Sequence, residues 1–284
     1  MAESKRVKAF RLAIAKDIPK FPNDKASLQA LQSKSLGALL IDHRKWRIRY
    51  IAPRARAVVI EPTATADPRW QSLAHEVQSL LEKVRSGADL TPYLSLQPHT
   101  RGFTPAATER GSDVDRWADK DLMLNVMGYH HLHFDAAPGN AVRSDNVMFA
   151  YVTRDKFMVV GIFNHAVFEQ TESNPTITAE RDHLWQIFDQ RSARGLAPAS
   201  VIVPTVITLS GHKIEFVRAA TVYARLVAGI DPSLDDPNYV RCLYEQAGVP
   251  ISKRPKVEWY LHFLDLGLLD KNVGAFICLK EGPN

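Results

Sequence analysis

The sequence predicts an α+β fold in which helices and antiparallel strands occupy separate stretches of the chain. Strand-like runs of apolar and β-branched residues concentrate between residues 129 and 165. Before and after this stretch, apolar residues recur at helical spacing, and strands do not alternate with helices as βαβ units. We therefore expect an antiparallel sheet flanked by helices, with a helical basic N-terminal region and a C-terminal α+β extension.

Two helices are predicted in the N-terminal region. Asn23 or Asp24 can cap a helix over about residues 26–46, because either side chain accepts a hydrogen bond from a free backbone amide of the first turn. Asp67 begins a second helix, whose apolar residues keep helical spacing until Gly87 ends it.

Residues 88–115 lose the helical periodicity and gather prolines and glycines. We expect a loop or linker between modules, or alternatively a lid that carries His99, Arg101 and Arg110. The predicted domains are a basic, mainly helical N-terminal region at 1–87, the loop at 88–115, and an α+β domain at 116–284.

The predicted sheet lies in the middle of the chain. A helix at about 116–127 is closed by Gly128, and three strands follow it between residues 129 and 163. Thr178 can cap the next helix, which runs to about residue 193. The remaining predicted elements are a strand pair at 201–208 and 213–217, helices at 219–228 and 237–247, and an apolar hairpin of 257–264 and 275–279.

Composition indicates an ordinary globular protein. The 284 residues are 45% hydrophobic and 24% charged, and no apolar run reaches the length of a membrane span. The N-terminus lacks the apolar segment of a signal peptide, so we expect a cytoplasmic protein without membrane contact. Cys242 and Cys278 fit a reducing compartment and have no metal-binding spacing.

Positive charge is concentrated in the first 60 residues. They hold 14 Lys and Arg against 4 Asp and Glu, a net of +10, whereas residues 61–284 hold 22 against 27, a net of −5. Guanidinium groups bind phosphates and aromatic rings stack on bases, so the densest part suits RNA or single-stranded DNA. The alternative is a solvated element with its aromatic side chains in the core. The predicted nucleic-acid-binding residues are Arg44, Lys45, Trp46, Arg47, Arg49, Arg54 and Arg56.

Histidines gather in the predicted sheet. Side chains of a strand alternate between its faces, so His131 and His133 share a face with Tyr129. Leu132 lies on the opposite, core-like face, which predicts that the two histidines are on the more open side. His165 follows the last strand directly, and an ionisable group at a strand end is well placed for function.

The strands and their flanking residues form a pattern over about residues 116–168. It consists of Tyr129-His130-His131-Leu132-His133-Phe134, an arginine-containing loop, Val147-Met148-Phe149-Ala150-Tyr151-Val152, an acidic turn, and Phe157–Phe163 before a histidine. This pattern resembles the sheet of RelE/HigB-type ribonuclease toxins. The resemblance implies that basic and imidazole side chains cleave mRNA without a metal, and that an inhibitory antitoxin is a partner.

Metal-free RNA cleavage needs a base for the 2′-hydroxyl proton, an acid for the leaving 5′-oxygen and a cation for the charged phosphorane. The histidines and Arg143 meet these needs. We assign His131 or His133 as the base, His165 as the acid and Arg143 as the phosphate clamp, and Tyr129 can orient the phosphate. No cofactor is expected, and RNA is the expected partner.

Two alternatives remain open at this stage. A His-x-His pair on one strand face with a third histidine can hold zinc or iron, as in cupin-type sites, and the ligands would be His131, His133 and His165. A non-enzymatic protein is the other alternative: its basic N-terminal patch would bind nucleic acid or an acidic partner, and its histidines would pack or respond to pH.

Overall fold

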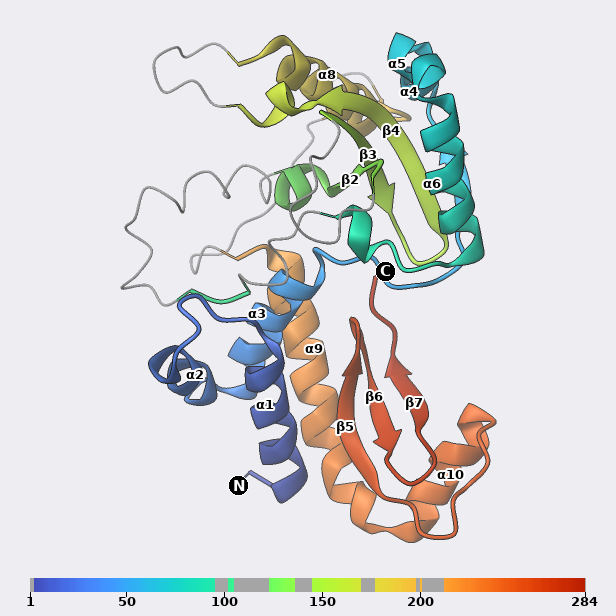
Figure 1. Ribbon diagram of the computed structural model, residues 1–284. Helices are drawn as coiled ribbons and strands as arrows, with labels where there is room; N and C mark the ends of the chain where they lie inside the picture. Colours follow the sequence, from blue (N-terminus) through green and yellow to red (C-terminus); the bar gives the residue numbers. More distant parts are fainter. Residues whose placement is uncertain are drawn as a thin grey trace. The chain divides into compact units, whose positions relative to one another are not determined.

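The chain folds into two compact units in the computed structural model, which describes residues 3–94, 102–104, 123–135, 145–169, 177–197, 200 and 212–283 (Figure 1). Unit 1 consists of Met1–Ile48, Gln97–Glu109 and Ile207–Pro283, and unit 2 of Arg49–Leu96 and Arg110–Val206. This grouping differs from the predicted boundaries at 87 and 115, because the C-terminal segment folds together with the N-terminal helices. The predicted α+β class is confirmed.

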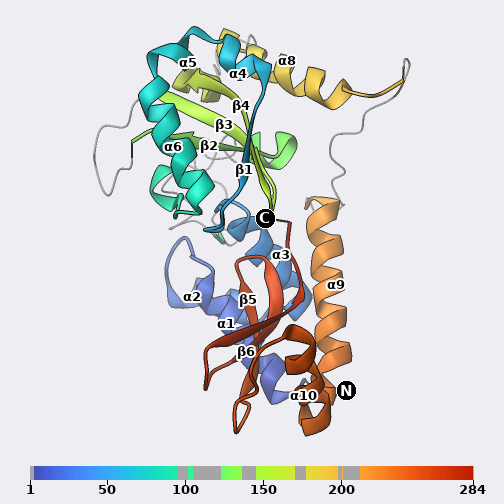
Figure 2. The same ribbon diagram turned by 90° about the vertical axis from the view of Figure 1, so that its right-hand side faces the viewer.

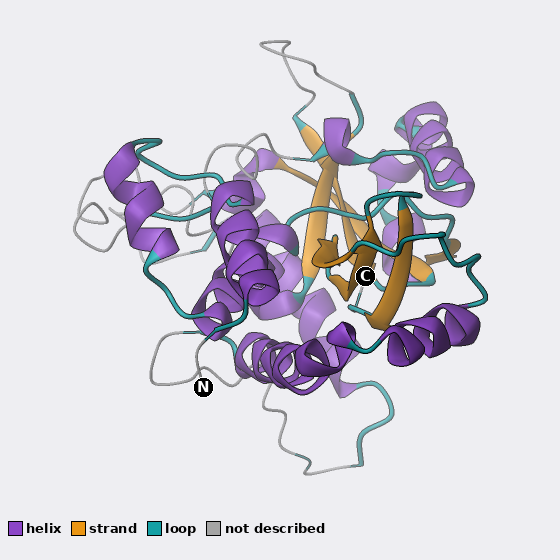
Figure 3. Ribbon diagram, turned by 90° about the horizontal axis from the view of Figure 1, so that it is seen from below, coloured by secondary structure: helices purple, strands orange, loops and turns teal. Residues whose placement is uncertain are grey.

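Unit 1 combines helices from both ends of the chain with a three-stranded antiparallel sheet of order β5-β6-β7. Its strands are β5 (Val257–His262), β6 (Asp265–Asp270) and β7 (Ala275–Lys280). Its helices are α1 (Lys5–Asp17), α2 (Lys25–Gln32), α3 (Leu36–Arg47), α9 (Ile214–Ile230), the 3-10 helix η6 (Asp231–Asp235) and α10 (Pro237–Ala247). The secondary structure is coloured in Figure 3.

Three predicted elements of unit 1 are corrected. The single helix at 26–46 is two helices, because Ser35 caps α3 by accepting a hydrogen bond from the Ala38 amide. The predicted strand at 213–217 is the beginning of α9. The predicted C-terminal hairpin is a three-stranded meander, since β6 pairs with both neighbours. Helix α10 is confirmed at its predicted bounds, and the strand at 201–208 lies outside the described residues.

Unit 2 is built on a four-stranded sheet of order β1-β4-β3-β2. Strand β1 runs parallel to β4, and the other pairs are antiparallel. The strands are β1 (Ala57–Ile60), β2 (Tyr129–His133), β3 (Asn146–Val152) and β4 (Lys156–Asn164). The helices are α4 (Pro62–Ala66), α5 (Pro68–Ser72), α6 (Ala74–Ser86), the 3-10 helices η1 (Thr91–Tyr93) and η5 (His165–Phe168), the π-helix η4 (Met123–Met127) and α8 (Ala179–Ala193).

The three predicted middle strands are confirmed as contiguous antiparallel strands. Residue Leu73 separates α5 from α6, so the predicted helix from Asp67 to Gly87 is two helices. Of the predicted helix at 116–127, only η4 falls within the described residues.

Hydrophobic cores cover both faces of the four-stranded sheet (Figures 1 and 2). On one face, α6 packs on Leu132, Met148 and Ile162. On the other, α8 and η5 pack on Phe149 and Phe163. A sheet covered on both sides offers polar groups to solvent mainly at its strand ends, which is where the candidate site lies. Among the described residues, no helix is both long and apolar enough to span a membrane.

Candidate functional site

Three histidines meet at one end of the four-stranded sheet. His131 and His133 are alternate residues of β2, and His165 begins η5 directly after β4. The rings of His133 and His165 are stacked, with centroids 5.3 Å apart and an interplanar angle of 26°. The His131 ring lies edge-on to that of His133 at 6.1 Å. The three predicted proton-transfer residues therefore form one cluster, as the prediction of a shared site requires.

The cluster is more buried than the sequence suggested. The face of His131 and His133 was expected to be open, but the second core covers it, because Phe168 and Phe149 pack against the His131 ring at 4.9 and 6.0 Å. His133 exposes 3% of its surface and His131 is half-buried. His165 exposes 34% of its side chain.

Strand register brings Asp145 to His165. Asn146 at the start of β3 pairs with Asn164 at the end of β4, so the residues just beyond this pair are neighbours. The Nδ1 atom of His165 lies 2.7 Å from the Asp145 carbonyl oxygen and 3.2 Å from its Oδ1 atom. A carbonyl oxygen only accepts hydrogen bonds, so Nδ1 carries the hydrogen, and Nε2 holds the lone pair of the neutral ring.

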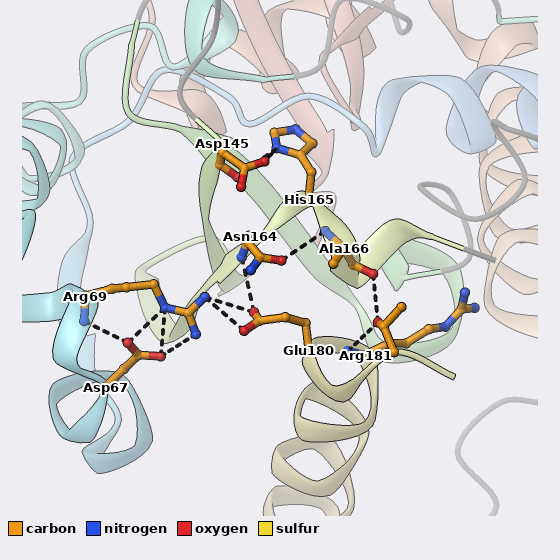
Figure 4. A network of polar contacts seen from close by, with 9 residues as sticks. Asp67, Arg69, Asp145, Asn164, His165, Ala166, Glu180 and Arg181 are labelled. Atoms are coloured by element: carbon orange, nitrogen blue, oxygen red, sulfur yellow. Dashed lines mark hydrogen bonds and ion pairs between the residues drawn. The ribbon is translucent and has the colours of Figure 1, made fainter. Parts of the chain in front are cut away.

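Hydrogen bonds from three segments fix the turn that carries His165 (Figure 4). The Asn164 side chain accepts from the Ala166 amide at 3.0 Å, and Thr178 donates to the Ala166 carbonyl at 2.7 Å. The Asn164 amide donates to the Glu180 carboxylate at 3.1 Å. These bonds join the end of β4 to the first turn of α8, so the position of His165 depends on α8.

An ion-pair network holds Glu180 in turn (Figure 4). Arg69 donates to both carboxylate oxygens of Glu180, at 3.1 and 2.9 Å, and also to Asp67. The hydrogen bonds that Arg69 donates to these carboxylates raise its pKa, with Asp67 contributing most. Burial works to raise the pKa of Asp67, but the Arg69 hydrogen bonds outweigh it and the pKa is lowered. Through Glu180, the network fixes the turn that carries His165.

Tyr129 does not belong to this cluster. It lies at the other end of β2, four residues and therefore about 13 Å from His133. Its ring contacts Phe188 at 6.0 Å and the Arg191 guanidinium at 5.6 Å. Burial raises the pKa of its phenol, against the opposing effect of Arg191. The predicted role of Tyr129 in orienting the phosphate is therefore wrong, because it shares a face with the histidines but not an end of the strand.

Arg143, the predicted phosphate clamp, lies outside the described residues. In the sequence it stands two positions before Asp145, the partner of His165. Sequence reasoning missed Asp145, Asn164 and Glu180. Asp145 could have been predicted: counting residues back from the turn between β3 and β4 places it opposite His165.

The metal-site alternative is not supported by this geometry. Within the described ranges, no three His, Cys, Asp or Glu side chains are arranged to hold a metal ion. Stacked rings direct their nitrogens outward in nearly parallel planes, so His133 and His165 do not converge on one point.

The predicted nucleic-acid patch is corrected at two positions. Trp46 and Arg56 each expose only 4% of their surface. Arg56 donates to the carbonyls of Thr153, Ala52 and Arg54, and burial lowers its pKa to about 10. Both residues stabilise the fold, because a buried side chain cannot contact a phosphate or base. The patch is also divided, since Arg44 to Arg47 belong to unit 1 and the other cations to unit 2.

The three cations of the predicted patch that belong to unit 1 differ in burial and in their contacts. Arg44 is half-buried, and burial lowers its pKa against the opposing effect of Tyr223. The Arg47 guanidinium lies 4.1 Å from the ring centre of Phe263. Lys45 is exposed and available to a partner.

No family model, curated protein or solved structure matches this chain.

Proposed function

We propose that unit 2 is a metal-independent ribonuclease whose proton-transfer groups are the clustered histidines. The observation that carries the proposal is the stacked pair of His133 and His165, in which Asp145 fixes the His165 tautomer. Imidazoles that share one cluster but differ in their surroundings can serve as the acid and the base, which is what metal-free RNA cleavage needs.

The roles follow from the surroundings of each ring. Asp145 orients the His165 ring through Nδ1, at 2.7 Å from its carbonyl and 3.2 Å from its carboxylate, so Nε2 is the atom that would pass a proton to the substrate. His133 exposes only 3% of its surface, so it does not contact the substrate, and its stacked ring would hold that of His165 in place. Of the two histidines predicted as the base, we therefore assign His131, because it is less buried than His133 and contacts it.

The proposed reaction is an internal transesterification. The base removes the 2′-hydroxyl proton, and the 2′-oxygen forms a bond to phosphorus. The bond from phosphorus to the 5′-oxygen breaks, and His165 gives its proton to that oxygen. The products are a 2′,3′-cyclic phosphate and a free 5′-hydroxyl. RNA is the substrate class, because DNA lacks the attacking hydroxyl. Arg143 remains our prediction for the cation that stabilises the phosphorane.

The test is cleavage of a defined single-stranded RNA in EDTA by the full chain. His165→Ala should lower the rate on the order of 10²-fold or more, and Asp145→Asn by a smaller factor, because the tautomer is held less firmly. His75→Ala is the matched control, since His75 is an exposed histidine of the same unit outside the cluster. An RNA with one 2′-deoxy substitution should resist cleavage at that position.

Cleavage that EDTA abolishes, or that survives His165→Ala unchanged, would sink the proposal. Absence of cleavage, together with RNA retardation that weakens with salt, would favour a protein that only binds nucleic acid.

We also propose, from the resemblance to RelE/HigB-type toxins, that expression of the chain arrests growth and that an inhibitory protein partner exists. Induction of the wild-type chain should stop growth, whereas induction of the His165→Ala chain at equal abundance should be tolerated. Equal tolerance of both chains would remove the toxin part of the proposal and leave the ribonuclease part to the cleavage assay.

A further inference from the structure

The three-stranded sheet of unit 1 has one covered and one uncovered face. Residues of the inner face are buried, and Trp259 contacts Phe10 of α1 and donates to Asp231 of η6. Helices α1 and α9 lie on this inner side (Figures 1 and 2). On the outer face, Tyr260 exposes 42% of its surface and His262 is also exposed.

Aromatic rings cluster on the outer face. Phe276 of β7 lies between two side chains of β5, with ring centroids 6.0 Å from Tyr260 and 5.7 Å from His262. Phe263, in the turn after β5, extends the cluster with a ring 5.4 Å from that of His262. The rings come from two strands and span the sheet between them.

Gly267 of the central strand makes this arrangement possible. A Cβ atom at this position would lie 2.6 Å from the ring of Phe276 and would also clash with the Ile277 carbonyl. Because position 267 of the central strand has no side chain, the Phe276 ring can lie over β6 toward Tyr260, although the register neighbour of Phe276 is Leu269. Gly267 thus leaves room on the outer face for the Phe276 ring.

We infer that the outer face of β5-β6-β7 binds single-stranded nucleic acid by stacking bases on Tyr260, His262 and Phe276. Exposed rings on a sheet stack bases without a strong sequence preference. This site is separate from the histidine cluster of unit 2, and its binding does not depend on cleavage.

The charge of unit 1 favours a polyanionic ligand. Unit 1 holds 21 Lys and Arg against 14 Asp and Glu, a net of +7, whereas unit 2 holds 15 against 17, a net of −2. Lys253, Arg254 and Lys256 are exposed just before β5. Glu258, the acidic residue of β5, forms an ion pair with Lys271 at 2.6 Å, so its charge is balanced. Phosphates can therefore approach the rings without net repulsion.

The composition of the face also favours nucleic acid over a protein partner. Besides the rings, the outer face carries Glu258, Gly267, Leu269 and Cys278, so Leu269 is its one aliphatic side chain and the face has no wide aliphatic centre. Protein interfaces bury an apolar core with charged residues kept to the rim. Stacking requires only ring faces and nearby cations.

Two native cysteines test the inference without mutation. Cys278 is exposed and pairs in register with Gly267, on the same face as the rings, whereas Cys242 is exposed on α10. A 12-nucleotide single-stranded DNA, which lacks the 2′-hydroxyl and cannot undergo the proposed cleavage, should slow iodoacetamide alkylation of Cys278. Alkylation of Cys242 should keep its rate. Equal rates at Cys278 with and without DNA would overturn the inference.

Substitutions measure how much each ring contributes to DNA binding. Tyr260→Ser and Phe276→Ser should each weaken binding of the same DNA about tenfold or more, by fluorescence anisotropy. Val222→Ser is the matched control, because Val222 in α9 also exposes 42% of its surface. A perfect duplex of the same sequence should bind more weakly, since its bases cannot stack on the sheet.

Three results would contradict the inference and leave the ribonuclease proposal untouched. One is equal binding of duplex and single strand, and another is full binding by a folded Tyr260→Ser chain. The third is concentration-dependent self-association that Tyr260→Ser abolishes, which would assign the face to a contact between copies of the chain. His165→Ala should bind the DNA normally, so failure of cleavage and failure of binding remain distinguishable.

Discussion

The two sheets of this protein differ in how many of their faces are covered, and therefore in where they present functional side chains. The four-stranded sheet of unit 2 is covered on both faces, so its clustered histidines lie at a strand end, where His165 exposes 34% of its side chain. The three-stranded sheet of unit 1 is covered on one face, and its other face presents aromatic rings. The doubly covered sheet can hold a precise polar cluster, whereas the half-covered one can offer a broad surface.

The largest expected effect compares one aromatic residue from each sheet. Phe149 is fully buried between strands and helix, so Phe149→Ala should lower the free energy of unfolding by about 3–5 kcal/mol. Tyr260→Ala removes a ring from the open face and should cost less than about 1 kcal/mol. Urea denaturation followed by far-UV circular dichroism measures both values. Similar costs for the two variants would mean that the outer face of unit 1 is also covered.

The second prediction separates two histidines of the same cluster. His133 is buried, so His133→Ala should cost about 1–3 kcal/mol of stability in addition to activity. His165 is largely held by Asp145 at the surface, so His165→Ala should lose activity while the free energy of unfolding changes by less than about 1 kcal/mol. Thermal and urea unfolding, run beside the cleavage assay, provide the readout. A His165→Ala chain that unfolds would assign the cluster to packing.

Local signals in the sequence were sufficient for some elements. Helix α10 has an Asp236 cap, Pro237 at its first position and a left-handed Gly248 after its end, and each of these signals lies within the element. The three middle strands follow from their apolar and β-branched residues in the same way. The clustering of His131, His133 and His165 was also predicted, because strand alternation and a strand end determine it.

Other features depend on contacts between segments far apart in the sequence. The burial of His133 results from α8 and η5, which no pattern within β2 reports. Residues 213–217 contain Ile214 and Phe216, which fit a strand, but they form the first turns of a 17-residue helix that packs with α3. Strand β6 was not predicted, because its apolar run is short, contains Gly267 and has an aspartate at each end. The strand is stabilised by pairing with both of its neighbours.

The third prediction concerns the predicted nucleic-acid patch, whose basic residues are divided between the two units. Lys45 is exposed, so Lys45→Ala should reduce the slope of log affinity for RNA against log salt by about 0.7, the value for one contact to a single strand. Arg56 donates to three backbone carbonyls, so Arg56→Ala should leave that slope unchanged and lower stability. Nitrocellulose filter binding at several salt concentrations tests both variants. A flatter slope for Arg56→Ala would restore that residue to the nucleic-acid surface.

The smallest expected effect is a pH dependence in unit 1. His43 is buried, and this burial lowers the pKa of its imidazole below the ordinary 6.5, even though Asp17 works to raise it. The unfolded chain therefore takes up a proton at a higher pH than the folded protein does. The contribution of His43 to the free energy of unfolding is fully present above about pH 6.5 and falls as the pH drops toward the folded-state pKa.

The measurement is urea denaturation at pH 7.5 and pH 5.5 for the wild-type chain and for His43→Gln. The wild-type chain should lose more stability between these values than the variant, by no more than about 1.4 kcal/mol per pH unit, the limit for one proton. His75→Gln serves as the control, because His75 is exposed and its replacement leaves the buried imidazole in place. Equal losses for wild type and His43→Gln would show that His43 does not stay neutral in the fold. The pH response would then come from other groups.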